Sequence, residues 1–205
     1  MLGRLRPLLA TVLRAPASLL LKWGIHPNAV TIFGTVGVVA SALWFFPQGE
    51  RMLFWGVLAC AIFSMTDMLD GTMARLSGKT SRLGAFLDSL LDRFADAAIF
   101  GGVVVGFHEE DPHTALAALV CMLVGTFVPY ARARAEGIGV DAKVGIAERS
   151  DRLAFGAIAA AAVGLGAPLW ILTWTLWLLS VAGIITVGQR IAAVVKATRE
   201  DVPAA

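Results

Sequence analysis

Long apolar runs separated by short polar connections constrain the fold of this chain more than any other feature. The first run is Ala29 to Phe46, and others begin near Met52, Thr114, Leu153 and Leu169. About 20 apolar residues are enough for a helix to cross the hydrocarbon core of a bilayer. Only 16% of the residues are charged, against roughly a quarter in soluble domains, which is too few to coat a water-facing surface. We therefore predict a membrane protein.

Mean hydropathy alone does not reveal a further membrane helix, because the first half of that helix is rich in charged residues. It runs from Arg82 to Phe107 and contains Asp88, Asp92, Arg93 and Asp96. With this helix the chain is predicted to be all-α, a polytopic bundle of six transmembrane helices. No internal repeat is visible, so residues 1–205 are expected to form a single domain. Residues 1–23 mix basic residues with leucines, which predicts an amphipathic helix lying on the membrane surface.

The orientation of the bundle follows from its lysines and arginines. Six crossings place the N-terminal segment, the connections at 76–82 and 132–152, and the C-terminal tail on one side. Every Lys and Arg except Arg51 falls on that side or on the adjacent helix ends. Loops rich in Lys and Arg stay in the cytoplasm. Trp44, Trp55, Trp170 and Trp174 then fall near the outer helix ends, where an aromatic belt is expected. We predict a plasma-membrane protein whose termini and active site are cytoplasmic.

Four aspartates inside the second and third helices predict a cation site. Asp67 and Asp70 are three residues apart and Asp88 and Asp92 four, so each pair shares a helix face. Asp70 precedes the turn at Gly78 by eight residues and Asp88 follows it by ten, which gives them similar depth on antiparallel helices. Oxygen ligands without His or Cys favour Mg²⁺ or Mn²⁺. Like charges so close together require such a cation, or protonation of some of the acids.

Basic residues beside the acids extend the prediction to a diphosphate site, because Arg75 and Arg82 lie at the same level and suit phosphate oxygens. The alternative is that the aspartates form packing salt bridges with Arg75, Arg82 and Arg93. Acids inside a membrane are costly and are by default functional, which favours the site. For Asp96, a salt bridge with Arg93 and a role in the site are equally good interpretations.

These residues carry a resemblance to a known family. Residues 67–75 read DMLDGTMAR, and Gly84, Asp88 and Asp92 follow. All eight positions of the signature of the CDP-alcohol phosphotransferases are filled at the family spacing, over 26 residues. Six spans and an amphipathic N-terminal segment also resemble that family, so the resemblance covers essentially the whole chain.

The resemblance implies a role for each site residue. Asp67, Asp70 and Asp88 would bind two Mg²⁺ or Mn²⁺ ions, and Asp92 would touch the metal and act as general base on an acceptor hydroxyl. The donor, CDP-diacylglycerol, would be contacted by a further set of residues: Gly71, Arg75, Asn28, Ala29, Val30, Thr31 and Ser81. The family also implies a homodimer among membrane lipids, and no nucleic-acid partner.

Two features in the C-terminal part of the chain narrow the choice of acceptor substrate. Residues 130–152 read YARARAEGIGVDAKVGIAERSDR, and Gln189-Arg190 ends the sixth apolar run; both are similar to actinobacterial phosphatidylinositol phosphate synthases. That similarity places Arg132, Arg152 and Arg190 around the phosphate of the acceptor, inositol phosphate. We expect phosphatidylinositol phosphate and CMP as products. Glycerol 3-phosphate is the alternative acceptor, and a divalent-cation transporter is the alternative from another class of protein.

Overall fold

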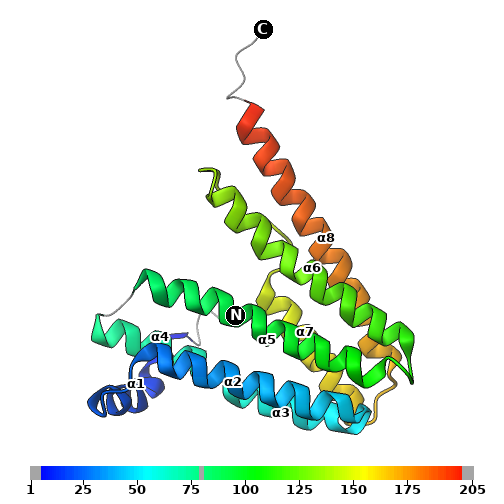
Figure 1. Cartoon of the computed structure of the whole chain (residues 1–205), viewed down its shortest axis with the longest axis horizontal. Helices are drawn as coiled ribbons and strands as arrows, with labels where there is room; N and C mark the ends of the chain where they lie inside the picture. The colour runs from blue at the N-terminus through cyan, green and yellow to red at the C-terminus, as the bar shows by residue number, and fades with distance from the viewer. Residues whose placement is uncertain (1–5, 79–80, 200–205) are drawn as a thin grey trace. The chain divides into compact units, whose positions relative to one another are not determined.

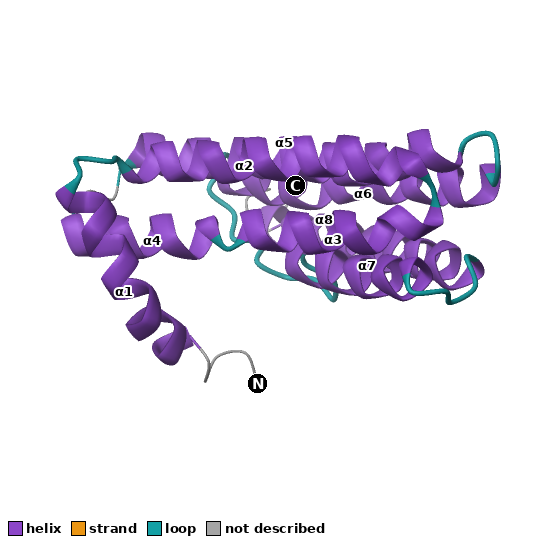
Figure 2. Ribbon diagram, turned by 90° about the horizontal axis from the view of Figure 1, so that it is seen from below, coloured by secondary structure: helices purple, strands orange, loops and turns teal. Residues whose placement is uncertain are grey.

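The structure, a computed structural model, describes residues 6–78 and 81–199, and all regular structure within those ranges is helical (Figure 2). The helices are α1 (Arg6–Lys22), α2 (Pro27–Phe45), a short 3₁₀ turn η2 (Phe46–Gln48), α3 (Glu50–Ser64), α4 (Thr66–Ser77), α5 (Arg82–Phe107), α6 (Pro112–Glu136), α7 (Arg149–Gly164) and α8 (Trp170–Arg199). The predicted all-α class is confirmed. Of the predicted segment 1–23, the first five residues lie outside the described ranges.

Four stretches in the described residues are long and apolar enough to cross a membrane: Pro27–Gln48, Glu50–Ser77, Pro112–Glu136 and Trp170–Arg199. Their outer surfaces are apolar, since Phe33 is 63% exposed and Leu178 is 68% exposed. Large apolar side chains turned outward in this way suit contact with lipid. The protein is therefore a membrane protein. The other two predicted spans correspond to α5, which is rich in charge, and α7, which has 16 residues.

The chain forms two compact units, which we call the N-terminal unit (residues 1–45 and 56–99) and the C-terminal unit (46–55 and 100–205). In the N-terminal unit, α4 packs against both α1 and α2 (Figure 1). Ala17, Val30 and Met73, one residue from each of these helices, form its buried core. Gly34 lets α2 approach closely, because a Cβ there would lie 1.7 Å from Oγ1 of Thr66. These contacts hold α2 beside the acidic helix α4.

In the C-terminal unit, α6 and α8 lie side by side and α7 packs on α8 (Figure 1). The hydroxyl oxygens of Thr114 and Thr173 are 2.5 Å apart and join α6 to α8. A Cβ at Gly183 would lie 2.6 Å from Cγ1 of Val124, so this glycine allows the two helices to touch. Small residues at such crossings are typical of membrane helices.

The structure corrects two predicted details near the acidic helix. The first run was predicted to begin at Ala29, but α2 begins at Pro27, and the N–H of Asn28 donates to Nδ1 of His26 (3.3 Å). Proline suits the first helical position because its missing N–H would have no helical partner there. The second predicted span is interrupted at Met65, where α3 ends and α4 begins. The hydroxyl of Thr66 donates to the carbonyl of Phe63 (2.6 Å), a local bond that competes with the regular helical pattern.

The helices of the C-terminal unit continue further than predicted. Helix α6 runs to Glu136 and α8 to Arg199, so the predicted polar connection 132–152 shrinks to residues 137–148. The predicted basic tail is largely the end of α8. Hydropathy marks only the apolar part of a helix, whereas Arg, Lys, Glu and Ala have good helix propensity and prolong it into water.

Candidate functional site

A cavity of about 300 Å³ lies in the N-terminal unit at the predicted acidic cluster. Helices α2, α4 and α5 and the residue before α5 line it with Pro27, Asn28, Thr31, Asp67, Asp70, Gly71, Ala74, Ser81, Gly84, Ala85 and Asp88. Three of the four predicted metal ligands and four of the predicted donor contacts (Asn28, Thr31, Gly71 and Ser81) therefore share one cavity. Pro27 and Ala85 were not predicted, because apolar residues carry no chemical signal in the sequence.

Thr31 connects the acidic helix to α2. Its hydroxyl donates to a carboxylate oxygen of Asp70, and it also lies 3.3 Å from the carbonyl of Pro27. Asp70 itself is half-buried, whereas Asp67, one turn earlier on α4, is exposed. The two acids thus differ in freedom: Asp70 is held by a neighbouring helix, and Asp67 can turn.

The start of α5 closes another side of the cavity. The N–H of Gly84 donates to Oγ of Ser81 (2.9 Å), which satisfies a donor in the first turn of the helix. A Cβ at Gly84 would lie 3.2 Å from that oxygen and 3.4 Å from Oδ1 of Asn28. A larger residue at 84 would therefore crowd two predicted donor contacts, which explains why glycine suits this signature position.

The electrostatics of the cavity favour a cation. The charges of Asp88 and Asp92 both repel the carboxylate of Asp70. Carboxylate and hydroxyl oxygens are the ligands that Mg²⁺ and Mn²⁺ prefer, so the residues present fit such an ion. No three carboxylate, His or Cys side chains in the described ranges already form a ligand group as they stand. The exposed side chains of Asp67 and Asp88 would have to turn inward to complete one.

The remaining predicted residues of this site lie outside the cavity lining. Arg75 is beside it, because a Cβ at Gly71 would lie 3.7 Å from its Nη1, and its Nη2 donates to Oγ1 of Thr72 (3.1 Å). Ala29 is exposed, and Val30 belongs to the buried core. Asp92 follows Asp88 by one turn on α5, and its carboxylate lies 3.6 Å from Nη2 of Arg93.

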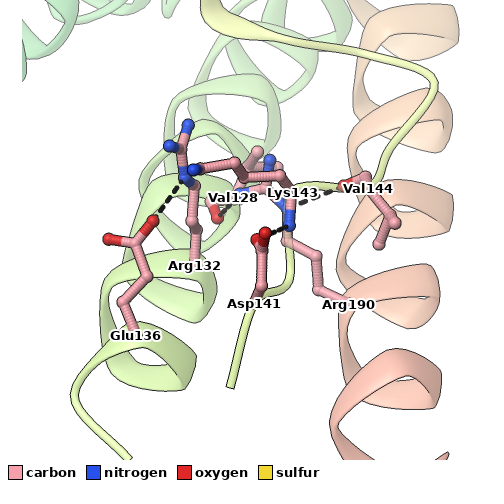
Figure 3. Close-up of polar contacts among 7 residues, drawn as sticks. All are labelled: Val128, Arg132, Glu136, Asp141, Lys143, Val144 and Arg190. Carbon is pink, nitrogen blue, oxygen red and sulfur yellow. Dashed lines mark hydrogen bonds and ion pairs between the residues drawn. The ribbon is translucent and has the colours of Figure 1, made fainter. Parts of the chain in front are cut away.

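The three arginines predicted to bind the acceptor lie in the C-terminal unit. Figure 3 shows Arg190 between two backbone carbonyls: its Nε donates to Val144 (3.0 Å) and its Nη1 to Val128. In the same view, Nε of Arg132 donates to Oε1 of Glu136 (2.9 Å). This pair joins residues four apart on one helix, a spacing visible in the sequence. Arg190 was predicted to mark the end of its helix, but it lies inside α8 because that helix continues to Arg199.

Arg152 is buried in the first turn of α7, against α6. A Cβ at Gly125 would lie 2.5 Å from Cζ of its guanidinium, which also lies over the ring of Phe100 at 5.8 Å. Spacings of three and four residues put Gly125, Val128 and Arg132 on one face of α6. All three arginines thus meet this face. Arg132 and Arg190 repel each other, while Glu136 and Glu148 offset part of the charge around Arg190.

Comparison with known proteins agrees with the chemistry of these residues. The sequence profile of the CDP-alcohol phosphatidyltransferase family matches residues 24–188. Among curated relatives, the phosphatidylinositol phosphate synthase of Cutibacterium acnes is 43% identical over 206 residues, covering 96% of this chain and 99% of that protein. The enzyme of the same name from Mycobacteroides abscessus is 42% identical over 194 residues, covering 92% of this chain and 86% of that protein.

Solved structures agree as well. The crystal structure of Mycobacterium tuberculosis phosphatidylinositol phosphate synthase with CDP-DAG bound superposes with a TM-score of 0.83 at 37% identity, covering 90% of this chain and 94% of the other. The same enzyme in complex with manganese and citrate gives a TM-score of 0.82 at 38% identity, covering 89% and 88%. The family profile spans most of the chain and the identities are high over nearly full lengths. The chain therefore belongs to the CDP-alcohol phosphatidyltransferase family.

Proposed function

We propose that this protein transfers the phosphatidyl group of CDP-diacylglycerol to inositol phosphate, giving phosphatidylinositol phosphate and CMP. The observation that carries the proposal is the cavity of the N-terminal unit. It gathers Asp67, Asp70 and Asp88 with four further residues that the family resemblance links to the donor. The names of the relatives support inositol phosphate as the acceptor.

The residues in and around the cavity have two proposed roles, metal binding and direct contact with the donor. Asp67, Asp70 and Asp88 would hold two Mg²⁺ or Mn²⁺ ions, in keeping with the manganese complex of the related structure. When bound, such ions neutralise the diphosphate and make CMP a better leaving group. Asn28, Thr31, Gly71 and Ser81, with Ala29, Val30 and Arg75 around them, would contact the donor. Gly71 leaves space for it, and Arg75 supplies positive charge beside that space.

Asp92 is the proposed general base. The hydroxyl oxygen of the acceptor forms a bond to the phosphorus of the phosphatidyl group, and the bond between that phosphorus and the CMP oxygen breaks. The proton of the hydroxyl passes to the Asp92 carboxylate. A carboxylate held near this hydroxyl can accept the proton as the new bond forms. The Asp92 side chain is 21% exposed, which leaves it accessible to substrate.

Arg132, Arg152 and Arg190 are the proposed ligands of the acceptor phosphate. Positive charge that faces positive charge along one face of α6 favours an anion there. Forked guanidinium groups suit the oxygens of a phosphate. A neutral acceptor such as serine would need no such cluster.

We further propose that the chain is one functional domain with six membrane-spanning helices, in which α5 and α7 complete the four apolar spans. Helix α1 would lie on the membrane surface. Trp44, Trp170 and Trp174 are more than 60% exposed, as residues of an aromatic belt would be. In this arrangement both termini and the active site face the cytoplasm, where water-soluble CMP can leave. A homodimer in the plasma membrane completes the proposal and follows from the family resemblance.

A direct assay tests the reaction. Purified protein is supplied with CDP-diacylglycerol, Mg²⁺ and one of four acceptors: inositol phosphate, glycerol 3-phosphate, free inositol or serine. We expect CMP release with inositol phosphate and little with the others. Faster release with glycerol 3-phosphate would make the protein a phosphatidylglycerophosphate synthase instead. No CMP release with any acceptor, together with Mn²⁺ uptake into proteoliposomes, would favour a transporter.

A further inference from the structure

The hydroxyl of Thr186 joins α8 to the connection between α6 and α7. Thr186 is fully buried, with 0% of its surface exposed. Its Oγ1 accepts hydrogen bonds from the N–H groups of Ile146 (3.2 Å) and Ala147 (3.1 Å). The same hydroxyl donates to the carbonyl of Ala182 one turn earlier on α8 (2.9 Å). One side chain thus supplies partners for two backbone amides of an otherwise irregular segment.

This segment also contacts the proposed acceptor site. Val144 precedes Ile146 by two residues, and its carbonyl accepts from Nε of Arg190 (3.0 Å). Thr186 and Arg190 are four residues apart on α8, so their side chains lie on the same face of the helix. The position of the Val144 carbonyl therefore depends on the bonds that Thr186 makes two and three residues further along.

Gly145, in the connection between α6 and α7, lies directly against the Thr186 side chain. Its φ of +150° is a conformation that other residues rarely adopt. A Cβ there would lie 2.3 Å from Cγ2 of Thr186, but 3.3 Å from its Cβ and its Oγ1. The methyl group of Thr186 and the missing side chain of residue 145 are thus matched to each other.

We infer that Thr186 is a positioning residue for the acceptor: its hydroxyl fixes residues 144–147 against α8, and the Val144 carbonyl held in this way orients the Arg190 guanidinium. The inference rests on the proposed function, because it takes Arg190 as a ligand of the acceptor phosphate. A guanidinium has five N–H donors, and the bonds to Val144 and Val128 aim the group while leaving donors for an anion. Thr186 itself touches no substrate in this role.

The first test replaces the hydroxyl with a methyl group of similar shape. Thr186→Val removes the acceptor of two amide hydrogen bonds, so the KM for inositol phosphate should rise about tenfold while the KM for CDP-diacylglycerol changes less than about twofold. Thr186→Ser keeps the hydroxyl and should restore the wild-type value. Thr175→Val is the matched control: it lies on the same helix, and its hydroxyl donates to Ile171 of its own helix (2.7 Å).

Amide hydrogen exchange supplies a readout that does not depend on activity. In Thr186→Val, the amides of Ile146 and Ala147 should exchange about tenfold faster than in wild type, since each loses its partner. Thr186→Ser and Thr175→Val should leave their exchange unchanged. Faster exchange with an unchanged acceptor KM would overturn the inference, and so would an equal rise in the KM of donor and acceptor.

A steric pair of variants covers the case in which Thr186→Val does not fold. Gly145→Ala should raise the acceptor KM, and Gly145→Ala combined with Thr186→Ser should lower it again, because serine lacks the Cγ2 that the new Cβ meets. The strain of the positive φ is common to both variants and cancels in the comparison. No recovery in the double variant would contradict the inference. If wild-type protein turned over no inositol phosphate, the proposed function would be wrong, while the exchange data would still decide whether Thr186 holds the segment.

Discussion

At the scale of single residues, the two clusters of charge are held in different ways. In the cavity of the N-terminal unit, Asp67 and Asp88 are exposed, and Asp70 is half-buried and bonded to Thr31. In the C-terminal unit, Arg152 and Arg190 are 6% and 5% exposed; Arg152 lies against Gly125 and Phe100, and Arg190 is bonded to two backbone carbonyls. We conclude that Asp67 and Asp88 keep the freedom to turn toward a cation, whereas Asp70, Arg152 and Arg190 are held in place by their surroundings.

The first residue-scale prediction separates the base from the metal ligands. Asp92→Asn keeps the size of the side chain but cannot take a proton, so kcat should fall by about 10²–10⁴ while CDP-diacylglycerol binding survives. Asp67→Asn should instead raise the Mg²⁺ concentration needed for half-maximal rate and weaken donor binding, because the charge of the carboxylate holds the cation. Steady-state kinetics at several Mg²⁺ concentrations and donor-binding measurements check both. Near-normal CMP release by Asp92→Asn would rule out Asp92 as the base.

A second residue-scale prediction concerns the contact between Arg152 and Gly125 of α6. Gly125→Ala would place a methyl group 2.5 Å from the guanidinium carbon, which must then move. The KM for inositol phosphate should rise about tenfold, the effect of losing one charge-assisted hydrogen bond, while the donor KM stays constant. Gly188→Ala is the control, because a Cβ there meets nothing within 4 Å. Equal acceptor kinetics in the two variants would mean that Arg152 does not bind the acceptor.

At the scale of elements, close helix packing brings together the residues of the proposed donor site. Helix α4 carries two of the acids, and it is positioned by its contacts with α1 and α2. Gly34 and Gly37 make the approach of α2 possible: a Cβ at Gly37 would lie 2.1 Å from Cδ1 of Phe63, in the last turn of α3. Without this approach, Thr31 could not reach Asp70. Small residues on α2 therefore belong to the architecture of the site although they touch no ligand.

The element-scale prediction tests this packing. Gly34→Ala would place a methyl group 1.7 Å from Oγ1 of Thr66, so α2 must shift away from the start of α4. Such overpacking costs about 1–3 kcal/mol of stability, and Tm should fall by several degrees. CDP-diacylglycerol affinity should fall with it, because Thr31 moves away from Asp70.

Gly156→Ala serves as the control for Gly34→Ala, since its Cβ meets nothing within 4 Å and alanine favours the helix. Thermal unfolding and donor binding are measured on both variants in the same detergent. Unchanged Tm and donor affinity in Gly34→Ala would mean that the close approach of α2 is not needed for the site.

At the scale of the whole molecule, the family profile runs across both units, from residue 24 to residue 188. Helix α5 belongs to both: its acidic first part lies in the N-terminal unit, and from Phe100 onward it lies in the C-terminal unit. The proposed metal ligands Asp67, Asp70 and Asp88 belong to the N-terminal unit, and the proposed acceptor ligands Arg132, Arg152 and Arg190 belong to the C-terminal unit.

The prediction at this scale concerns orientation in the membrane. Lys143 and Glu109 are both exposed, and the positive-inside rule puts them on opposite sides. Cysteines introduced at these positions should react with a membrane-impermeant maleimide from the cytoplasmic side for Lys143→Cys and from the outer side for Glu109→Cys. The native Cys60 and Cys121 are buried, at 7% and 1% exposure, so the unmodified protein is a suitable control. Labelling of both positions from the same side would refute the six-span arrangement.

The sequence by itself was sufficient for the helical class, the membrane location and the family, and it gave a metal-binding or donor-binding role to seven of the residues that line the cavity. These features depend on local geometry. The two pairs of aspartates sit three and four residues apart within helices, and one short turn joins the helices that carry them. The sequence can predict that the residues of such a signature lie close together, because helix periodicity and a turn near Gly78 bring them together.

Only the tertiary structure decided which distant residues meet. Thr31 and Asp70 are 39 residues apart, and Arg190 and Val128 are 62 apart. Arg152 likewise contacts Gly125 of another helix. Thr186 of α8 accepts hydrogen bonds from Ile146 and Ala147, which lie in a connection. Membrane helices are apolar on nearly every side, so their hydrophobic pattern does not indicate which face meets which neighbour. Close packing through small residues selects those faces, and it is specified only when the helices are assembled.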